Sequence, residues 1–597
     1  MILRRMNIFK YYLKIISCHK SNKSNGNIRI KNISFIIPYI KKQKRAFIIA
    51  FFLLVINSAL ILPSPAITGN IIDNVFVRKN MSELSLLVII LFILLFSSNF
   101  INIFQEYYFL RLSKEFIYSI RGDLFEKILK LPFSIFSEFQ TGYLVSRTDE
   151  VNQLGRFFSS TLLYLISDFI KFFGALFFLL HFNSKLTLIS LIAMPLFFEI
   201  SRRYIAGIRA SSVDVLEKGA RVREIVQESF SGIELIKTFA KEKKEVIKIK
   251  KKMRDLLESE IIQNLFSSIS GRILGLVTGI NLLIILWVSG YEIFKGRFTV
   301  GQYVAFVGYI NFLYGPVQLL ASTYLGFQNT IVACERIAEF FHSVAEDENP
   351  NRTYEIKKIA GEIEFKNVYY NYGNGRNCLD DISFTIKAEE KVAIVGASGA
   401  GKSTLINLIL GLYEPRKGKI FVDGKDLKNI TLASLRNKIG IVSQNIFLFN
   451  DTILDNIKYS RTDATIEDVI DAARASGAHE FIARLPYGYN TNAGEIGKKL
   501  SAGEKQRISI ARAILKNPDV IIFDEPTAHL DNIMVKVIYE SMKELFKYRT
   551  CIIISHHLID IAWVDHVIVL EDGKISQDGK HEDLINKIGR YHELFQG

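Results

Sequence analysis

Long apolar runs follow one another in this chain up to about residue 330. We count six of them: Ala46–Thr68, Leu84–Phe104, Thr161–Phe182, Leu186–Ile200, Ile273–Phe294 and Tyr303–Leu325. A helix needs about 20 residues to cross a membrane. Five runs reach that length, and the shorter fourth run, which contains Pro195, is expected to pair with the third across the turn at Asn183–Ser184. The pattern predicts six membrane-spanning helices, with both chain ends on one side.

The segments between these runs indicate which side that is. Residues 69–83, 183–185 and 295–302 form short connections, whereas 105–160 and 201–272 are long, charged and helical in pattern, so we expect the long ones in the cytoplasm. Residues 1–45 contain twelve Lys or Arg and no Asp or Glu, which places the N-terminus in the cytoplasm by the positive-inside rule. Isoleucines between positions 28 and 40 alternate with basic residues, which favours an interfacial elbow helix over a disordered basic tail.

The pattern changes at Gly361. Residues 362–366 alternate with period two, as a half-buried strand does, and short apolar strands then alternate with helical stretches to the C-terminus. About 235 residues suffice for one α/β domain. We therefore predict four parts: a basic N-terminus (1–45), an all-α transmembrane domain of six helices with long intracellular helical extensions (46–330), a linker (331–360) and an α/β domain (361–597).

Composition supports a membrane part and excludes other classes of protein. The mean hydropathy is +0.20 and 49% of the 597 residues are apolar. A positive mean hydropathy is rare in soluble chains. Four cysteines exclude a disulfide scaffold. The net charge of +15 suits nucleic acid or an anionic membrane surface; because the basic residues accumulate before the first apolar run, we expect membrane lipids and no nucleic acid as partners.

A glycine-rich loop carries the first chemical motif. Residues 391–395 predict a buried strand that runs into GASGAGKST and then into an apolar helix, which is the GxxxxGK[ST] motif in its strand–loop–helix setting. Backbone N–H groups of such a loop surround phosphate oxygens at a helix N-terminus. Lys402 is expected to reach the β and γ phosphates, and the Ser403 hydroxyl to bind Mg²⁺. The predicted nucleotide contacts here are Gly396, Ser398, Gly399, Ala400, Gly401, Lys402, Ser403 and Thr404.

Two carboxylates and a second anion site complete the chemistry. A buried strand at 520–523 ends in Asp524 and Glu525, at the sheet edge where ligands bind in α/β folds. We expect Asp524 to bind the metal, directly or through a water, and Glu525 to orient and polarise the water that attacks the γ-phosphate. Residues 500–507 open a helix with a Ser–Ala–Gly turn, which makes a further anion site. One nucleotide does not need two such sites, which favours a dimer that shares nucleotides across its interface.

These motifs resemble those of the ATP-binding-cassette (ABC) exporters, specifically half-transporters with six membrane helices fused to one P-loop nucleotide-binding domain, similar to bacterial multidrug, lipid and peptide exporters. Residues 500–507 resemble the family's signature, 528–531 its D-loop and 492–497 its exporter-specific loop. The resemblance implies ATP contacts from Tyr372, Gln444, Ser501, Gly503, Glu504 and Asp531, Mg²⁺ ligation by Ser403, Gln444 and Asp524, and catalytic roles for Glu525 and His556. Ala502, Glu504 and His529 depart from the residues usual in the family.

The resemblance implies an ATP hydrolase that exports or flips a hydrophobic or amphipathic lipid, drug or peptide across the cytoplasmic membrane by alternating access. Glu525 and His556 are both present, which favours a homodimer; one half of a heterodimer remains an alternative, and an ATP-gated channel or regulator is a further one. Asp168 and Lys171 lie three residues apart inside the third apolar run. They either line the substrate path or neutralise each other as a structural pair.

Overall fold

The computed structural model describes residues 35–596 except 78–80, 139–140, 156–159, 374–376, 527–531, 556–562 and 588. Most of the predicted basic N-terminus, the D-loop with Asp531, and His556 lie outside the described residues. The chain divides into two compact units. The first comprises residues up to Glu126 together with Gly142–His342, and the second comprises Lys127–Thr141 and Ser343–Gly597.

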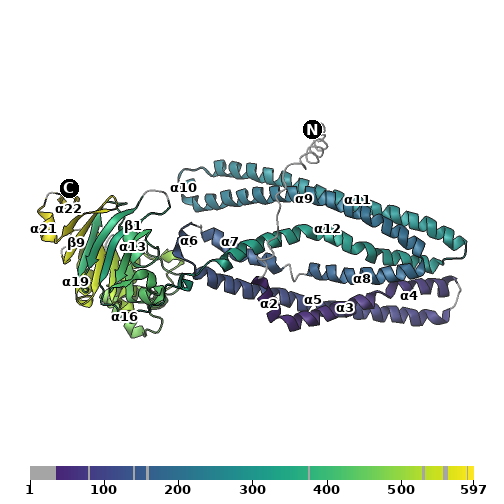
Figure 1. Cartoon of the computed structure of the whole chain (residues 1–597), viewed down its shortest axis with the longest axis horizontal. Helices are drawn as coiled ribbons and strands as arrows, with labels where there is room; N and C mark the ends of the chain where they lie inside the picture. The colour runs from purple at the N-terminus through teal and green to yellow at the C-terminus, as the bar shows by residue number, and fades with distance from the viewer. Residues whose placement is uncertain are drawn as a thin grey trace. The chain divides into compact units, whose positions relative to one another are not determined.

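The described secondary structure of the first unit is helical (Figure 1). Its helices are α2 (Ile37–Lys42), α3 (Lys44–Ile61), α4 (Ser64–Asn70), the π-helix η4 (Ile71–Val77), the short 3₁₀ helix η5 (Met81–Glu83), α5 (Leu84–Leu129), α7 (Thr141–Leu154), α8 (Ser160–Phe182), α9 (Ser184–Ser231), α10 (Ile233–Thr238), α11 (Glu242–Phe294) and α12 (Val300–His342). The six apolar runs lie on these helices, and the first run is interrupted at Leu62 and Pro63, between α3 and α4. Four helical stretches among the described residues are long and apolar enough to cross a membrane: Lys44–Val77, Met81–Leu129, Tyr164–Phe182 and Glu242–Phe294. The other two runs lie in α9 and α12.

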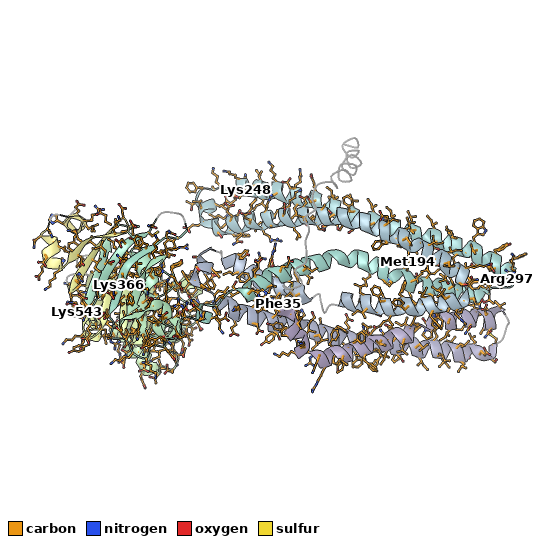
Figure 2. The ribbon with its side chains drawn as sticks, in the orientation of Figure 1. Phe35, Met194, Lys248, Arg297, Lys366 and Lys543 are labelled. Carbon is orange, nitrogen blue, oxygen red and sulfur yellow. The ribbon has the colours of Figure 1, made fainter. Side chains whose placement is uncertain are left out.

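The long connections continue the spans as helices, as predicted. Asn183 caps α9, because its side chain accepts hydrogen bonds from the backbone of Lys185 and Leu186 at 3.1 and 3.2 Å, which fixes the tight turn after α8. α9 and α11 run side by side (Figure 1), and Figure 2 labels Lys248 on this pair of helices. Lys248 of α11 forms an ion pair of 3.3 Å with Glu228 of α9. α12 extends to His342, so residues 331–342, which we assigned to the linker, are helical.

Glycines allow the first and last spans to approach closely. A Cβ on Gly69 would lie 2.5 Å from the carbonyl oxygen of Gly301, and a Cβ on Gly301 would collide with Gly69 in turn. Asp73 in η4 accepts hydrogen bonds from the backbone N–H of Gly301, at 2.8 Å, and from the Thr299 hydroxyl. The carboxylate therefore caps the start of α12 and ties it to the first span.

The second unit contains two sheets with helices around them, which is the predicted α/β architecture. The six-stranded sheet has the order β10-β9-β3-β8-β7-β6 and is parallel except for β10. Its strands are β3 (Lys391–Gly396), β6 (Ile439–Val442), β7 (Val520–Asp524), β8 (Thr550–Ile554), β9 (His566–Glu571) and β10 (Lys574–Gly579). The antiparallel four-stranded sheet has the order β2-β1-β4-β5, formed by β2 (Leu379–Ile386), β1 (Ile363–Tyr370), β4 (Lys417–Val422) and β5 (Lys425–Asp426).

Helices surround these sheets. They are α6 (Phe133–Glu138), α13 (Lys402–Ile409), α14 (Leu432–Lys438), α15 (Ile453–Lys458), α16 (Ile466–Ala475), α17 (His479–Arg484), α18 (Ala502–Lys516), α19 (Asn532–Leu545), α21 (His581–Ile585) and α22 (Arg590–Gln596). Ile394 of β3 and Ile522 of β7 are fully buried on either side of β8, in one core with Leu405 of α13. The strand order brings the carboxyl ends of β3, β8 and β7 to one sheet edge.

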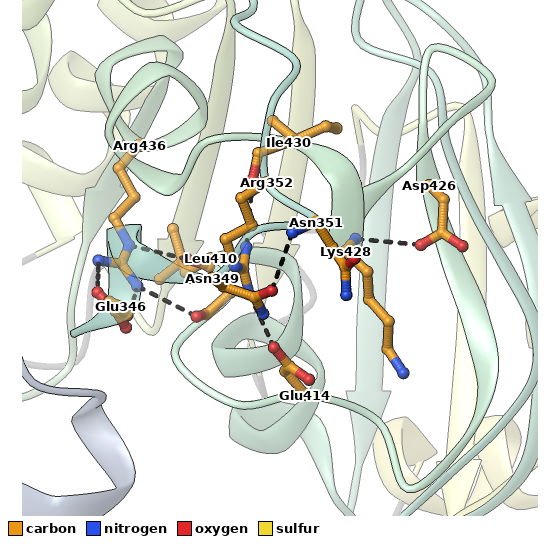
Figure 3. Close-up of polar contacts among 11 residues, drawn as sticks. Glu346, Asn349, Asn351, Arg352, Leu410, Glu414, Asp426, Lys428, Ile430 and Arg436 are labelled. Carbon is orange, nitrogen blue, oxygen red and sulfur yellow. Dashed lines mark hydrogen bonds and ion pairs between the residues drawn. The ribbon is translucent and has the colours of Figure 1, made fainter. Parts of the chain in front are cut away.

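Two arginines hold the segment that follows α12 against the second unit (Figure 3). Arg436 of α14 donates to both carboxylate oxygens of Glu346, at 2.7 and 3.0 Å. Arg352, whose side chain is 3% exposed, pairs with Glu414 at 2.9 Å and donates to the backbone carbonyl of Ile430 at 3.2 Å. The Arg352 guanidinium is buried, so removing its partners would leave an uncompensated buried charge, and these contacts anchor the start of the unit.

Candidate functional site

The glycine-rich loop connects β3 to α13, as the motif predicts. Gly401, directly before α13, has a φ of +106°, and a Cβ there would lie 2.8 Å from the Cys378 carbonyl oxygen, so only glycine fits. The Lys402 ammonium donates to the carbonyl oxygens of Gly396 and Ala397, at 2.7 and 2.9 Å. Burial lowers the pKa of Lys402 from its usual value. The cation is therefore held against the loop, where it can meet an anionic phosphate.

Two carboxylates face this loop from the end of β7. Burial raises the pKa of Asp524, and the charge of Glu525 raises this pKa further, while Lys402 opposes the shift. Glu525 has a left-handed backbone with a φ of +52°, and its N–H donates to the carbonyl of Ile554 at 2.9 Å. This conformation is unusual for a residue with a Cβ and turns the chain sharply after the strand.

Gln444, just after β6, reaches the same place. Its side-chain amide donates to Glu525 Oε2 at 2.7 Å, so the structure brings together two residues that lie 81 positions apart. His556 follows the end of β8 by two positions in sequence but lies outside the described residues, as does Asp531. The described site therefore contains Lys402, Gln444, Asp524 and Glu525 at one sheet edge.

The chemistry of this edge fits a magnesium ion. Mg²⁺ prefers oxygen ligands and usually binds through one or two carboxylates together with substrate phosphates. Ser403, Gln444 and Asp524 offer a hydroxyl, an amide and a carboxylate oxygen. The raised pKa of Asp524 shows that burial and the charge of Glu525 disfavour its ionised form, and a bound cation would offset that cost.

Aromatic side chains lie beside the loop. The ring of Tyr372 is 45% exposed, and its hydroxyl is 3.0 Å from the Thr404 hydroxyl. Its edge meets Tyr370 and Tyr413, with ring centroids 5.0 and 5.4 Å apart. The exposed ring can stack on a base, and its neighbours hold it in place. Sequence reasoning missed the role of Tyr413, because no local pattern links it to Tyr372, which lies 41 positions earlier in the chain.

The signature segment forms a capping box at the start of α18. The Ser501 hydroxyl accepts from the backbone N–H of Glu504 at 3.3 Å, and Glu504 Oε2 accepts from both the N–H and the hydroxyl of Ser501, at 2.8 Å each. Glu504 is one of the residues that the resemblance predicts to contact ATP. In the structure its carboxylate folds back onto the N–H and hydroxyl of Ser501, at the positive end of the α18 dipole.

A buried glutamine connects this helix to the carboxylate strand. Gln506 is 1% exposed, and its side-chain amide donates to the carbonyl oxygen of Pro526, the residue after Glu525, at 2.9 Å. Sequence reasoning missed this contact, although a polar residue on the apolar face of a helix was the available signal. The bond fixes the position of the signature helix relative to Glu525.

Comparisons with known proteins agree with this geometry. Residues 47–317 match the model of the ABC transporter transmembrane region, and residues 379–528 match the ABC transporter model. The chain is 33% identical over 568 residues to the putative multidrug export ATP-binding/permease protein YgaD of Bacillus subtilis (strain 168), covering 94% of this chain and 98% of that protein.

Two further similarities extend along nearly the whole chain. The ATP-dependent lipid A-core flippase of Syntrophus aciditrophicus (strain SB) is 31% identical over 578 residues, covering 97% of this chain and 96% of that protein. Among solved structures, a bacterial Atm1-family ABC exporter with ATP bound superposes with a TM-score of 0.84 at 26% identity, covering 93% of this chain and 98% of that one.

Proposed function

The chain belongs to the ABC transporter family, and from this premise we propose that it uses ATP to move a hydrophobic or amphipathic substrate across the cytoplasmic membrane. It is a membrane protein with an ATP-hydrolysing domain in the same polypeptide. Relatives named as a multidrug exporter and as a lipid A-core flippase support export or flipping of a drug or lipid. Alternating access fits this activity, because ATP binding supplies a free-energy difference between two conformations.

One observation carries the hydrolysis step: the hydrogen bond of 2.7 Å between Gln444 and Glu525, at the sheet edge that also carries Lys402 and Asp524. Glu525 is the carboxylate placed to take a proton from the attacking water, since Asp524 is assigned to the metal. Gln444 holds the Glu525 side chain in one orientation. Lys402 and the loop N–H groups bind the phosphates.

Ser403, Gln444 and Asp524 would hold Mg²⁺ in this account. When bound, the ion neutralises charge on the phosphate oxygens. Tyr372 would stack on the adenine, since its ring is half exposed beside the loop. On the family resemblance alone, we propose that His556 contacts the γ-phosphate. On the same ground, we propose that Asp531 contacts the opposite nucleotide site of the dimer.

A dimer of two such chains is the proposed working unit. Each second unit has one phosphate loop and one exposed helix start at Ser501, so two copies arranged head to tail would bind two nucleotides between them. We propose a homodimer, since the sequence carries both Glu525 and His556. Six spans and the basic residues before Ala46 support a cytoplasmic location for the N-terminus and for the nucleotide-binding domain.

The test is ATP hydrolysis by the purified full-length chain. Glu525→Gln should lower turnover by about 10²–10⁴-fold, as the loss of a general base does. The matched control is Glu540→Gln on the exposed side of α19, which should leave turnover unchanged. Retained hydrolysis in Glu525→Gln, or an equal loss in both variants, would remove Glu525 from the proposed role.

A further inference from the structure

Two charged residues inside the third apolar run point to the class of substrate. Asp168 and Lys171 lie on α8 three residues apart, so they share one side of the helix. Lys171 Nζ is 3.5 Å from Asp168 Oδ1, the outer limit of a hydrogen bond. Charged groups within a span are costly and usually face the bundle interior or a watery path.

The aromatic stripe of α8 shows which way the pair faces. Phe169, Phe173 and Phe177 are 44%, 65% and 69% exposed and follow one another at four-residue intervals, which makes one continuous stripe. At about 100° per residue, Asp168 and Lys171 project from roughly the opposite side of the helix. The exposed stripe suits lipid, so the charged pair faces away from lipid.

Helix α12 lies against the charged side of α8. A Cβ added to Gly315 would be 3.6 Å from Asp168 Oδ2, which places the carboxylate beside this glycine. Because glycine has no side chain, α12 leaves room next to the carboxylate. The pair therefore lies between α8 and α12, in the interior of the first unit.

Accessibility along this side of α8 falls from its start to its end. Tyr164 is 49% exposed, the side chains of Asp168 and Lys171 are 24% and 15% exposed, and Ala175 and Leu179 are fully buried. The charged pair therefore lies where the accessible stretch ends. A molecule that entered along this side would meet these two charges last.

We propose that Asp168 and Lys171 bind the polar end of a zwitterionic amphiphile, an inference that rests on the proposed transport function. The cationic group of the substrate contacts Asp168, and its phosphate or carboxylate contacts Lys171. The contact of 3.5 Å is the only polar contact of either side chain among the described residues, so both charges keep free hydrogen-bonding capacity. A zwitterion adds no net charge to the span, whereas a purely anionic or cationic amphiphile adds one.

The experiment compares three short-chain probes on the purified full-length chain in an uncharged maltoside detergent. The probes are dihexanoyl phosphatidylethanolamine (zwitterionic), dihexanoyl phosphatidylglycerol (anionic) and decyltrimethylammonium (cationic). Their binding is measured by native mass spectrometry, and their stimulation of ATP hydrolysis in parallel. We expect the zwitterion to act at the lowest concentration on the wild-type chain.

Single substitutions should change the ranking of the probes in opposite directions. Asp168→Asn should weaken the zwitterion at least tenfold, about 1.4 kcal/mol, and favour the anion over the cation; Lys171→Gln should weaken it similarly and favour the cation. Phe173→Leu on the lipid-facing stripe is the control and should leave the ranking unchanged. The double variant Asp168→Lys/Lys171→Asp keeps both charges and should recover most of the zwitterion response.

Specific results would overturn this inference. The inference is wrong if the three probes keep their wild-type ranking in both Asp168→Asn and Lys171→Gln. If the single variants fail to fold, the double variant decides, because a stable double variant with no zwitterion preference would make the pair structural. If the ranking test fails but the wild-type chain still shows ATP hydrolysis that depends on Glu525, only this inference is refuted and the proposed function stands. Absence of that hydrolysis refutes the proposed function separately, while the binding measurement still tests the charged pair.

Discussion

Replacing Glu504 by Gln removes one charge from the first turn of α18 and keeps the length of the side chain. Glu504 Oε2 accepts from the Ser501 N–H and hydroxyl, both at 2.8 Å. A hydrogen bond to a charged group contributes about 1.5–3 kcal/mol and a neutral one about 0.5–1.5 kcal/mol, so the contact with the hydroxyl weakens by about 1 kcal/mol. Gln still completes the capping box, so the helix start is retained.

We therefore expect the Ser501 hydroxyl of Glu504→Gln to bind the phosphate of a nucleotide on the opposite copy more readily. A gain of about 1 kcal/mol corresponds to about a fivefold higher apparent affinity for ATP, and in any case less than tenfold. The assay is an ATP titration of dimer closure in a Glu525→Gln background, where ATP is not consumed. Glu504→Ala is the control, since it also removes the Glu504 half of the capping box and should lower the melting temperature.

Two results of this titration would refute the reasoning. An unchanged or lower affinity would show that the carboxylate does not compete with phosphate for the Ser501 hydroxyl. A gain well above tenfold would show that Glu504 faces the phosphate directly. The site would then be a weakened one, and a heterodimer with a different partner chain would become the better account.

Three further predictions concern other parts of the molecule. Ser501→Ala should abolish ATP hydrolysis while a fluorescent ATP analogue still binds at the phosphate loop. Asp524→Asn should stop hydrolysis and should raise the melting temperature of the protein measured without nucleotide. Folding raises the pKa of the Asp524 carboxyl, so the folded state loses stability as the pH rises from 3.8 through the pKa of the folded state. Asn does not ionise, so the variant avoids this loss at neutral pH. An unchanged or lower melting temperature would contradict this. Gly301→Ala should cost about 1–3 kcal/mol of stability through overpacking, because the added Cβ would collide with Gly69. The control Gly290→Ala, with nothing within 4 Å of the added Cβ, should cost less. Equal melting temperatures of the two variants would contradict the close approach of Gly301 to Gly69.

The parts of this fold that could be predicted from sequence depend on local patterns. The glycine-rich loop was placed correctly between a strand and a helix, because its glycine spacing and the apolar residues on both sides are contiguous in the chain. The strand that ends in Asp524 was found by the same kind of signal. Apolar runs also predicted the long helices, since the length of a run sets the length of the helix.

Contacts between distant residues could not be predicted in the same way. Asp73 and Gly301 meet across 228 positions, and their contact depends on a π-helix that no sequence pattern indicated. The contact of the Glu504 carboxylate with Ser501 was not predicted either, because it depends on one rotamer of Glu504, a choice that composition does not reveal. Helix α12 continues to His342 because apolar residues such as Ile337 remain buried beyond the predicted end of the span.

Transport of a hydrophobic dye into inverted membrane vesicles tests the central claim most directly. We predict that vesicles carrying the wild-type chain accumulate the dye against its gradient with ATP but not with a non-hydrolysable analogue, and that Glu525→Gln vesicles with equal amounts of protein do not. Equal accumulation in wild-type and Glu525→Gln vesicles, or movement of the dye only down its gradient, would contradict ATP-driven export.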